Sequence, residues 1–290
     1  MKKLISLSLV LILVIGSNVF AQTDNKLEVK LADVLAFDSK EYLEGYMKPF
    51  VTAFGTGMGG ALFHRAYAKG FPRFDVGISA VYLSIPEEAK TYNFGNTEVP
   101  TFFGDKSNPP TIGTLNAASG TGLNSFILPQ LQINLGLFAN FEVMARGFSQ
   151  SVDEIGDISL LGFGVKYGLS DLIPLPMFPL DLSVQAIYQT FNVSDWISAG
   201  TFGMNVQASV SLPALPLDFY AGVGFESTSM TIETDKIPGV NQGIGSVSID
   251  GNNGFRLNIG VGYTLLILNI HADYNLGEYN SFGGGAMIVL

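Results

Sequence analysis

The chain contains no cysteine and only two histidines among its 290 residues. Without cysteine there are no disulfides, thiolate metal sites or cysteine nucleophiles, so stability depends on burial and backbone pairing. Charged residues are also scarce, at 14%, and acidic side chains outnumber basic ones, which gives a formal net charge of −10. This acidic balance argues against nucleic acid as a partner, because phosphate backbones are themselves anionic.

The N-terminus has the pattern of an export signal. Lys2 and Lys3 precede an apolar stretch over residues 4–15, and Ala21 ends a small-residue cleavage site before Gln22. The apolar stretch is shorter than the roughly 20 residues that a membrane-spanning helix needs. We therefore predict a secretory signal peptide over residues 1–21, with a membrane anchor as the weaker alternative.

After this signal, polar and apolar residues alternate one by one over long stretches. In residues 198–212, Phe202 and Met204 fall on one parity while Asn205 and Gln207 fall on the other. This period of two predicts strands with one apolar and one polar face. A membrane helix would scatter the amides around its circumference, whereas a closed barrel turns all of them inward and pairs every backbone group.

The alternation predicts an all-β protein, an antiparallel transmembrane β-barrel of ten strands within residues 73–290. Six segments alternate clearly, at 126–138, 180–191, 198–212, 217–225, 255–263 and 268–276, and four alternate less regularly, at 74–83, 141–150, 157–169 and 281–290. Short turns separate most of these segments, whereas residues 86–125 and 233–253 are long and rich in Gly, Asn and Thr. Outer-membrane barrels show this asymmetry, with the short turns facing the periplasm.

Two hairpin turns determine which side chains share a face of the wall. A two-residue turn at residues 265–266 pairs Asn258 with Asp273, and a three-residue turn at residues 139–141 keeps Glu142 inside the barrel. An unpaired charge facing lipid is destabilising by roughly 2 to 4 kcal/mol at the bilayer midplane. We therefore expect the charged residues of both hairpins to lie in the lumen.

An even strand count leaves residues 22–72 outside the wall. The first part has helical apolar spacing, with Asp38 or Ser39 as a cap and Pro49 near its end, and a Gly-rich part follows. We predict that this segment plugs the lumen, with the helix at the periplasmic mouth. The predicted plug residues inside the barrel are Phe54, Gly55, Gly57, Gly59 and Gly60. Alternatively, residues 51–66 form a wall strand paired near residues 98–103, which gives twelve strands.

Three stretches carry a resemblance to a known group of proteins. They are YLEGYMKPFVTAFGTGMGGALFHRA at residues 42–66, FDVGISA at residues 74–80 and GDISLLGFGVKYGL at residues 156–169. They resemble an uncharacterised family of outer-membrane barrels from Bacteroidota, and this resemblance implies a location in the bacterial outer membrane and a barrel fold, without an activity. The Gly-rich N-terminal segment is less closely similar to that of fatty-acid transport porins. The chain ends in Ile288, Val289 and Leu290 rather than the Phe that ends many such barrels.

The residues that could carry chemistry are few, and alternation places them in the lumen. The predicted lumenal polar set is Glu142, Arg146, Lys166, Glu226, Arg256, Asn258, His271 and Asp273. His271 and Asp273 lie two residues apart on one face, which suits a proton or ligand site but equally suits polar residues satisfied inside a wet barrel. Acidic residues in loops 152–157 and 233–235 could bind a cation or simply be solvated. We predict no enzyme, cofactor or metal site.

These observations lead to two functional hypotheses. The first is an outer-membrane channel or carrier for a small solute, an apolar one among the candidates. The second is a non-transporting envelope barrel that anchors its loops or binds a partner. The lumenal charges could select solutes, or they could neutralise one another in a blocked interior. The predicted partners are outer-membrane lipid and a small solute, and the sequence identifies no protein partner.

Overall fold

The computed structural model describes residues 27–107, 109–152, 156–171, 180–212, 215–238, 240 and 243–290. The predicted signal peptide at residues 1–21 and the predicted turn at residues 172–179 lie outside the described residues. No helix in the described part of the chain is long and apolar enough to cross a bilayer.

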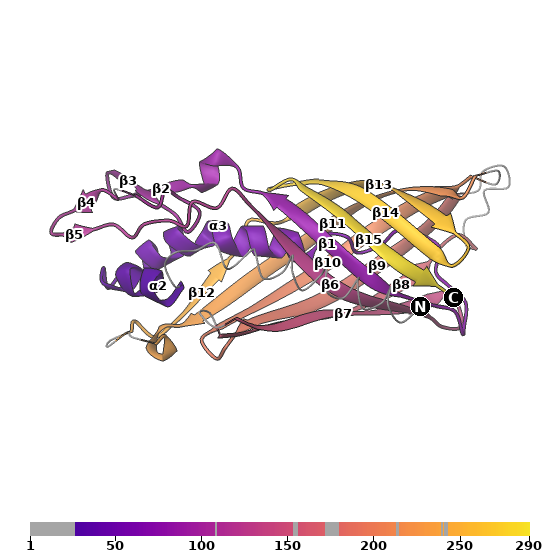
Figure 1. Ribbon diagram of the computed structural model, residues 1–290, viewed down its shortest axis with the longest axis horizontal. Coiled ribbons are helices and arrows are strands. Elements are labelled where there is room, and N and C mark those ends of the chain that lie inside the picture. Colours follow the sequence, from indigo (N-terminus) through magenta and orange to yellow (C-terminus); the bar gives the residue numbers. More distant parts are fainter. Residues whose placement is uncertain are drawn as a thin grey trace.

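Within the described residues, ten antiparallel strands close into a barrel (Figure 1). They are β1 (Phe74–Ser84), β6 (Ser125–Gly136), β7 (Phe141–Val152), β8 (Gly156–Gly168), β9 (Leu180–Val193), β10 (Ile197–Ser211), β11 (Leu217–Glu233), β13 (Phe255–Leu265), β14 (Leu268–Gly277) and β15 (Ser281–Val289). Each strand pairs with its neighbours in the chain order, and β1 pairs with β15 to complete the wall. The prediction of a ten-stranded barrel is confirmed.

The remaining strands lie in the two long loops. β12 (Ser246–Asp250) adds to one end of β11, while β2 (Thr91–Phe94) pairs with β3 (Thr97–Pro100) and β4 (Thr111–Ile112) pairs with β5 (Leu115–Asn116). Two short 3₁₀ turns accompany them, η1 (Glu87–Ala89) and η2 (Thr234–Lys236). We call the end of the barrel that carries these elements the long-loop end and the other end the short-turn end.

Outward-facing apolar side chains form a band around the barrel, which we call the apolar band. In β10, Phe202, Met204 and Val206 point outward and are about half exposed, whereas Gln207 points inward and is fully buried. Aromatic side chains lie near both edges of this apolar band, with Tyr188, Phe202, Phe225, Phe255, Tyr274 and Phe282 toward the long-loop end and Phe141, Tyr167, Phe219 and Tyr263 toward the short-turn end.

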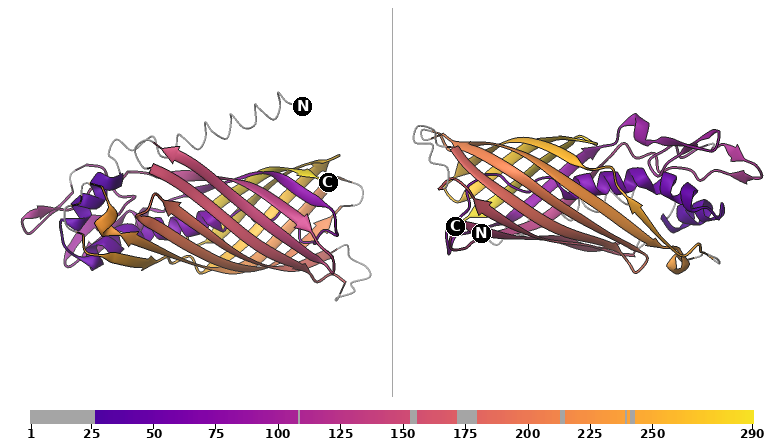
Figure 2. Two further views of the ribbon diagram at one scale, coloured as in Figure 1. Left: turned by 90° about the horizontal axis from the view of Figure 1, so that it is seen from below. Right: turned by 180° about the vertical axis from the view of Figure 1, so that it is seen from behind.

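Beyond the apolar band, five strands reverse the facing of their apolar residues. In β11, Phe225 points outward, but Met230 and Ile232 are fully buried while Ser229 and Thr231 lie on the outer face. The same reversal places apolar side chains inward at Ile158, Leu160, Phe191, Val193, Ile197, Ala199, Val247 and Ile249. We call this extension, formed by residues 156–160, 190–193, 197–201, 226–233 and 246–250, the collar. Figure 2 shows these strands continuing alongside the N-terminal helices.

Two helices precede the wall. α2 (Leu27–Leu35) lies beyond the barrel at the long-loop end, and α3 (Lys40–Met58) points along the barrel axis into the lumen (Figure 1). The Ser39 hydroxyl caps α3 by accepting the backbone N–H of Tyr42 at 3.2 Å, which agrees with one of the two predicted caps. The hairpins β2–β3 and β4–β5 pack beside these helices. We call residues 27–50, 85–107 and 109–124 together the cap.

Two expectations about the N-terminal helix are wrong. α3 does not end near Pro49 but continues to Met58, because Phe54 and Met58 are buried against the collar and this packing outweighs the backbone hydrogen bond that proline lacks. The helix also lies at the long-loop end rather than at the mouth with the short turns. The chain instead crosses the lumen through residues 59–70 and reaches the short-turn end where β1 begins.

Residues 51–66 are all buried and pair with no wall strand, so the twelve-stranded alternative is wrong. β3, which covers part of residues 98–103, pairs only with β2. Because these residues lie inside the wall rather than in it, they fill the lumen. We call residues 51–70 the lumenal segment.

Both predicted hairpin registers are shifted by two residues, although every side chain keeps its predicted face. Asn258 lies opposite Asn275 rather than Asp273, because the turn is formed by residues 266–267 and Leu266 adopts a positive φ of 56°. In the other hairpin, residues 139 and 140 have positive φ and form the tight turn, and Glu142 lies opposite Gly136. The extra residue is on the β6 side of that turn, not at Phe141.

Candidate functional site

The short-turn half of the lumen contains a buried cluster of charges. Glu142 on β7 accepts ion pairs from Lys166 on β8 at 3.3 Å and from Arg65 of the lumenal segment, also at 3.3 Å. The same guanidinium lies 2.5 Å from Asp75 on β1, and Lys69 pairs with Asp75 as well. Three cations and two carboxylates thus neutralise most of each other's charge, as buried ions must. The cluster ties the lumenal segment to three strands of the wall.

The two histidines of the chain meet beside this cluster. The His64 and His271 rings stack with centroids 5.0 Å apart and an interplanar angle of 20°. His64 accepts a hydrogen bond from Arg65, and His271 contacts the Asn269 amide oxygen at 3.0 Å through Nδ1. His271 therefore faces another imidazole rather than Asp273, with which the sequence analysis grouped it.

A second group of the predicted lumenal set lies nearer the middle of the barrel. Arg256 on β13 forms an ion pair with Glu226 on β11 at 2.8 Å and also donates to the Thr56 carbonyl at 2.6 Å. Asp273 accepts hydrogen bonds from Asn258 at 3.0 Å and from Asn275 at 2.7 Å. These polar side chains are satisfied mainly by one another and by the chain that fills the barrel.

Wall side chains bind the lumenal segment mainly through its backbone. Each carbonyl accepts a hydrogen bond from a different strand, namely Met58 from Gln189, Gly60 from Arg146, Leu62 from Gln132 and Arg65 from Lys166. The Ala66 N–H in turn donates to Ser209, and the Lys69 N–H to Glu142. An extended backbone has no internal partners, so this ladder satisfies groups that burial would otherwise leave unpaired.

The five predicted plug residues lie at the inner end of α3 and just after it. Phe54 packs against Phe191 in a tilted arrangement, with ring centroids 4.0 Å apart and an interplanar angle of 38°. Gly59 lies so close to the wall that a Cβ would collide with the Glu226 carboxylate and the Arg256 guanidinium, and a Cβ at Gly55 would meet Thr228 and Asn253. Gly57 and Gly60 face Leu128 and Val81. Close packing therefore favours glycine at positions 55, 59 and 60, since a Cβ at Gly60 would lie 2.8 Å from a Val81 methyl group.

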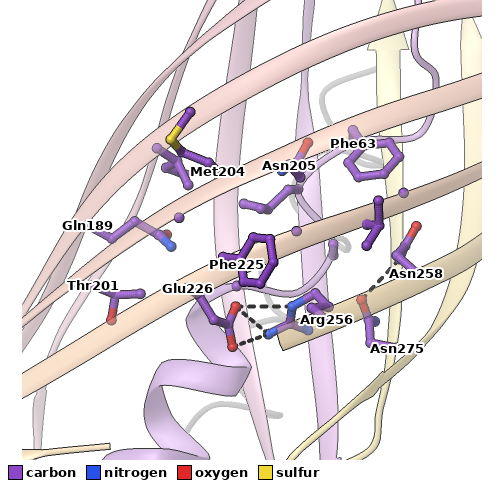
Figure 3. A pocket seen from close by; sticks show the side chains of 18 residues that line it. Phe63, Gln189, Thr201, Met204, Asn205, Phe225, Glu226, Arg256, Asn258 and Asn275 are labelled. Carbon is purple, nitrogen blue, oxygen red and sulfur yellow. Dashed lines mark hydrogen bonds and ion pairs between the residues drawn. The ribbon is translucent and has the colours of Figure 1, made fainter. Parts of the chain in front are cut away.

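A small cavity lies between the lumenal segment and the wall (Figure 3). It has a volume of ≈ 30 Å³ and lies beside glycines of β10 and β11, with Phe63 on the side of the lumenal segment. Three of its lining side chains have a buried polar atom without a partner, the Arg256 Nη1, the Gln189 Oε1 and the Asn258 Oδ1. This volume and these polar atoms suit about two water molecules.

The long-loop half of the lumen is apolar. Here α3 packs against the collar and the loop at residues 85–124 through a continuous core that includes Phe50, Phe54, Phe103, Trp196 and Met230. Burial raises the pKa of Tyr46, whose hydroxyl donates to the Ser119 carbonyl at 2.9 Å. Tyr92 similarly donates to the Tyr42 carbonyl. This half resembles the core of a water-soluble domain more than the interior of a pore.

Several residues of the site were missed by the sequence analysis. Arg65 and Lys69 lie in the lumenal segment, where no periodicity indicates their facing. Gln132 and Gln189 lie on strands that the alternation predicts, but they are absent from the predicted lumenal set. Asp75 could have been found, because it shares its parity on β1 with Gly77 and Ser79, opposite the apolar residues of that strand. Among the described residues, no three His, Asp or Glu side chains are placed to hold a metal ion.

The fold and its filled lumen define an antiparallel β-barrel that is closed by its own N-terminal segment. The chain belongs to a family of unknown function (DUF6588), whose family model matches residues 1–289. No curated protein matches the sequence. The link to Bacteroidota stays a prediction.

Solved structures similar to the barrel include three outer-membrane or transport proteins. One is OmpT, an outer membrane protein of Vibrio cholerae, with 16% identity and a TM-score of 0.30. The match covers 56% of this chain and 56% of OmpT, so this chain spans little more than half the length of OmpT. The second is the translocator domain of the autotransporter NalP from Neisseria meningitidis, with 9% identity over 76% of this chain and 88% of that domain and a TM-score of 0.33. The third is the toluene transporter TodX of P. putida, with 11% identity over 75% of this chain and 67% of TodX and a TM-score of 0.25. Similarity at this level concerns the fold alone.

Proposed function

We propose that the protein is an integral barrel of the bacterial outer membrane. The apolar band supports this proposal, because its outward side chains include Phe163, Met204, Ile259 and Ile270, all more than half exposed. Each wall strand is at least as long as β15, which has nine residues, and a tilted membrane strand needs roughly 9 to 11 residues. Aromatic residues lie along both edges of the band, as in other outer-membrane barrels. Water-soluble proteins rarely expose a continuous apolar surface of this extent.

In this orientation the short-turn end faces the periplasm and the long-loop end faces the cell exterior. The cap and the collar then stand above the membrane, where their polar outer faces meet water. α2 lies with them, so the chain enters the barrel from outside and crosses the lumen before β1 begins. Leu27 should accordingly be accessible from the cell surface.

The function that the geometry supports best is that of a closed barrel that anchors the cap at the cell surface. The observation that carries this proposal is the occupied lumen, in which wall side chains bind the backbone of the lumenal segment from Thr56 to Lys69. The cavity that the described residues leave beside this segment has a volume of ≈ 30 Å³, which is far below that of a small-molecule site. Of the two roles considered for the lumenal charges, mutual neutralisation has the better support, because Glu142 pairs with Arg65 and Lys166 and Glu226 pairs with Arg256.

Solute transfer is the second candidate, and one observation favours it. The cavity beside Phe63 leaves the Arg256 Nη1 and the Gln189 Oε1 without partners, so polar groups are available at the middle of the lumen. Transfer of a small solute would require the lumenal segment to move away from the wall. The two candidates therefore differ in whether this segment moves.

A reversible crosslink between α3 and the wall tests this difference. A Cβ at Gly57 would lie 3.9 Å from the Leu128 Cβ, which is close to the usual separation in a disulfide, and the native chain has no cysteine to interfere. Gly57→Cys with Leu128→Cys should form the bond under mild oxidation. Single-channel conductance in planar bilayers is then measured in the oxidised and reduced states.

We expect both states, and the wild-type protein, to be non-conducting. The two single-cysteine variants control for the substitutions themselves. Conductance that appears on reduction and vanishes on oxidation would overturn the anchoring function and establish a moving plug. For the orientation, a protease site inserted before Leu27 should be cut on intact cells; cleavage only after the outer membrane is opened would reverse the proposed topology.

A further inference from the structure

Two adjoining grooves of opposite polarity lie on the outer wall across β7 to β11. The first, of ≈ 340 Å³, lies within the apolar band and is lined by Phe163, Val165, Ala186 and other apolar residues. The second, of ≈ 530 Å³, lies on the collar and is lined by the polar residues Thr190, Asn192, Ser198, Ser227, Ser229 and Thr231. Tyr188 and Phe202 line both grooves. The pair thus forms one continuous amphipathic surface.

The local sequence explains both hollows. Ala186 lies between the longer side chains Val165 and Met204 on the outward face, so the wall is thin at that point. Higher on the wall, Gly200 lies opposite Thr190 and leaves room for the Tyr188 hydroxyl, which a Cβ at Gly200 would approach to 2.9 Å. Two small residues therefore produce the depressions on either side of the aromatic pair.

An aromatic row marks the boundary between the two grooves. Phe163, Tyr188 and Phe202 are cross-strand neighbours on β8, β9 and β10, and they are 59%, 54% and 47% exposed. Amphipathic rings of this kind favour the level where acyl chains meet headgroups. An amphiphile bound here would have its chains against the lower groove and its head against the upper one.

The upper groove is unusual because it has hydroxyl and amide groups but no charged side chain. The exposed cap, by contrast, has charged residues such as Glu87, Lys90 and Asp105. Hydroxyls and amides both donate and accept hydrogen bonds, which matches the hydroxyls of a sugar, and the neighbouring rings offer faces for its apolar side. A phosphate headgroup would instead favour Arg or Lys.

We propose that these two grooves form a binding site for a glycolipid of the outer leaflet, with an acyl chain in the apolar groove and the saccharide head in the hydroxyl-lined groove. Continuity with the apolar band favours a membrane lipid over a soluble sugar, and both volumes fall within the range of small-molecule sites. This inference rests on the proposed outer-membrane location.

Filling each groove tests the site. Ala186→Leu fills the apolar groove and Gly200→Val fills the polar one, while Ala272→Leu makes the same apolar change as the first variant on β14, away from both grooves. Each detergent-purified protein is titrated with monoglucosyldiacylglycerol, a glycolipid without phosphate, or with phosphatidylethanolamine, and bound lipid is counted by native mass spectrometry. Heat-modifiable migration in gels establishes that each barrel is folded.

We expect wild type and Ala272→Leu to bind monoglucosyldiacylglycerol with similar affinity and each groove variant to bind it about tenfold more weakly. Gly200→Val should leave phosphatidylethanolamine binding unchanged. Equal binding of the glycolipid by all four proteins would overturn the site, and so would equal preference for the two lipids by wild type. If Ala186→Leu fails to fold, Gly200→Val, which lies outside the band, still decides the question.

Membrane fractionation of cells that express the wild-type protein separates this inference from the one on which it rests. A protein absent from the outer membrane would contradict both. An outer-membrane protein whose groove variants bind lipid normally would contradict the glycolipid site alone.

Discussion

The two halves of the lumen are filled by the same segment in opposite ways. In the long-loop half, α3 buries Phe54 and Met58 against an apolar core. In the short-turn half, residues 59–70 have no regular structure of their own and are bound by charged and amide side chains of the wall. The difference follows the wall, because strands that are polar inside the apolar band become apolar inside the collar. A segment that passes through both halves therefore needs apolar side chains inside the collar and polar contacts inside the apolar band.

The two halves should consequently respond to different perturbations, and two signals separate them. Trp196 is the single tryptophan of the chain and is buried in the long-loop core, so its emission reports on that half. Heat-modifiable migration in gels reports on closure of the wall. Each substitution below can be assigned to one half by comparing these signals.

The largest effect is expected from Phe54→Ala, which removes a ring whose centroid lies 4.0 Å from that of Phe191. Loss of a fully buried aromatic side chain destabilises a core by about 3 to 5 kcal/mol. The Trp196 emission should shift at a lower temperature, while migration of the folded barrel changes little. A common shift in both signals would show that the two halves unfold as one unit.

A smaller but still large effect is expected from Val206→Arg, on the outward face of the apolar band. A charge facing lipid near the midplane is destabilising by about 2 to 4 kcal/mol, so folding into lipid vesicles should be impaired. The control is Ser248→Arg, which is outward and exposed on β12 of the collar and should change stability by less than about 0.5 kcal/mol. An equal loss of folding into vesicles for Val206→Arg and Ser248→Arg would contradict the distinction between the apolar band and the collar.

Gln189→Leu tests the polar half. The substitution leaves the buried Met58 carbonyl without its donor, which is destabilising by about 1 to 3 kcal/mol. Amide hydrogen exchange within residues 59–66 should accelerate, with Ser248→Ala as the surface control. Unchanged exchange there would mean that the ladder of side chains does not hold the segment.

The smallest effect concerns pH and the cap. Burial raises the pKa of the Tyr46 phenol above its unfolded value of about 10, so its stabilising contribution is complete below pH 10 and is lost as the pH rises further. The Trp196 emission should report loosening of this half above that pH. Tyr46→Phe should reduce this alkaline sensitivity while destabilising the cap by about 1 kcal/mol at neutral pH. An identical alkaline profile in the variant would assign the effect to other groups.

Much of the wall could be predicted from sequence because the period of two specifies facing directly. Gln207 and Val206 lie on their predicted faces, as do both residues of the Glu226–Arg256 pair. Register was less certain, since turns of two and three residues differ only in local φ. The positive φ of Leu266, a residue that rarely adopts it, has no signal in the sequence.

The collar was missed for a different reason. The predicted strand ends at Phe225, yet β11 continues to Glu233 with Met230 and Ile232 on the opposite parity. The alternation changes phase after Phe225 because the surroundings of the strand change there. Within the lumenal segment no period exists at all, so the roles of Arg65 and Lys69 depend entirely on tertiary contacts.

The pairing of β1 with β15 also restricts how the molecule can be assembled. These are the first and last strands of the wall, so the ring is completed only after the C-terminal strand is available. The lumenal segment precedes β1 and passes through the whole ring to reach α2 at the far side. The segment must therefore lie between the unjoined edges before they meet, since a folded α3 bearing α2 would have to be drawn through a finished ring. The wall therefore closes around the lumenal segment, and the segment does not enter a barrel that has already formed.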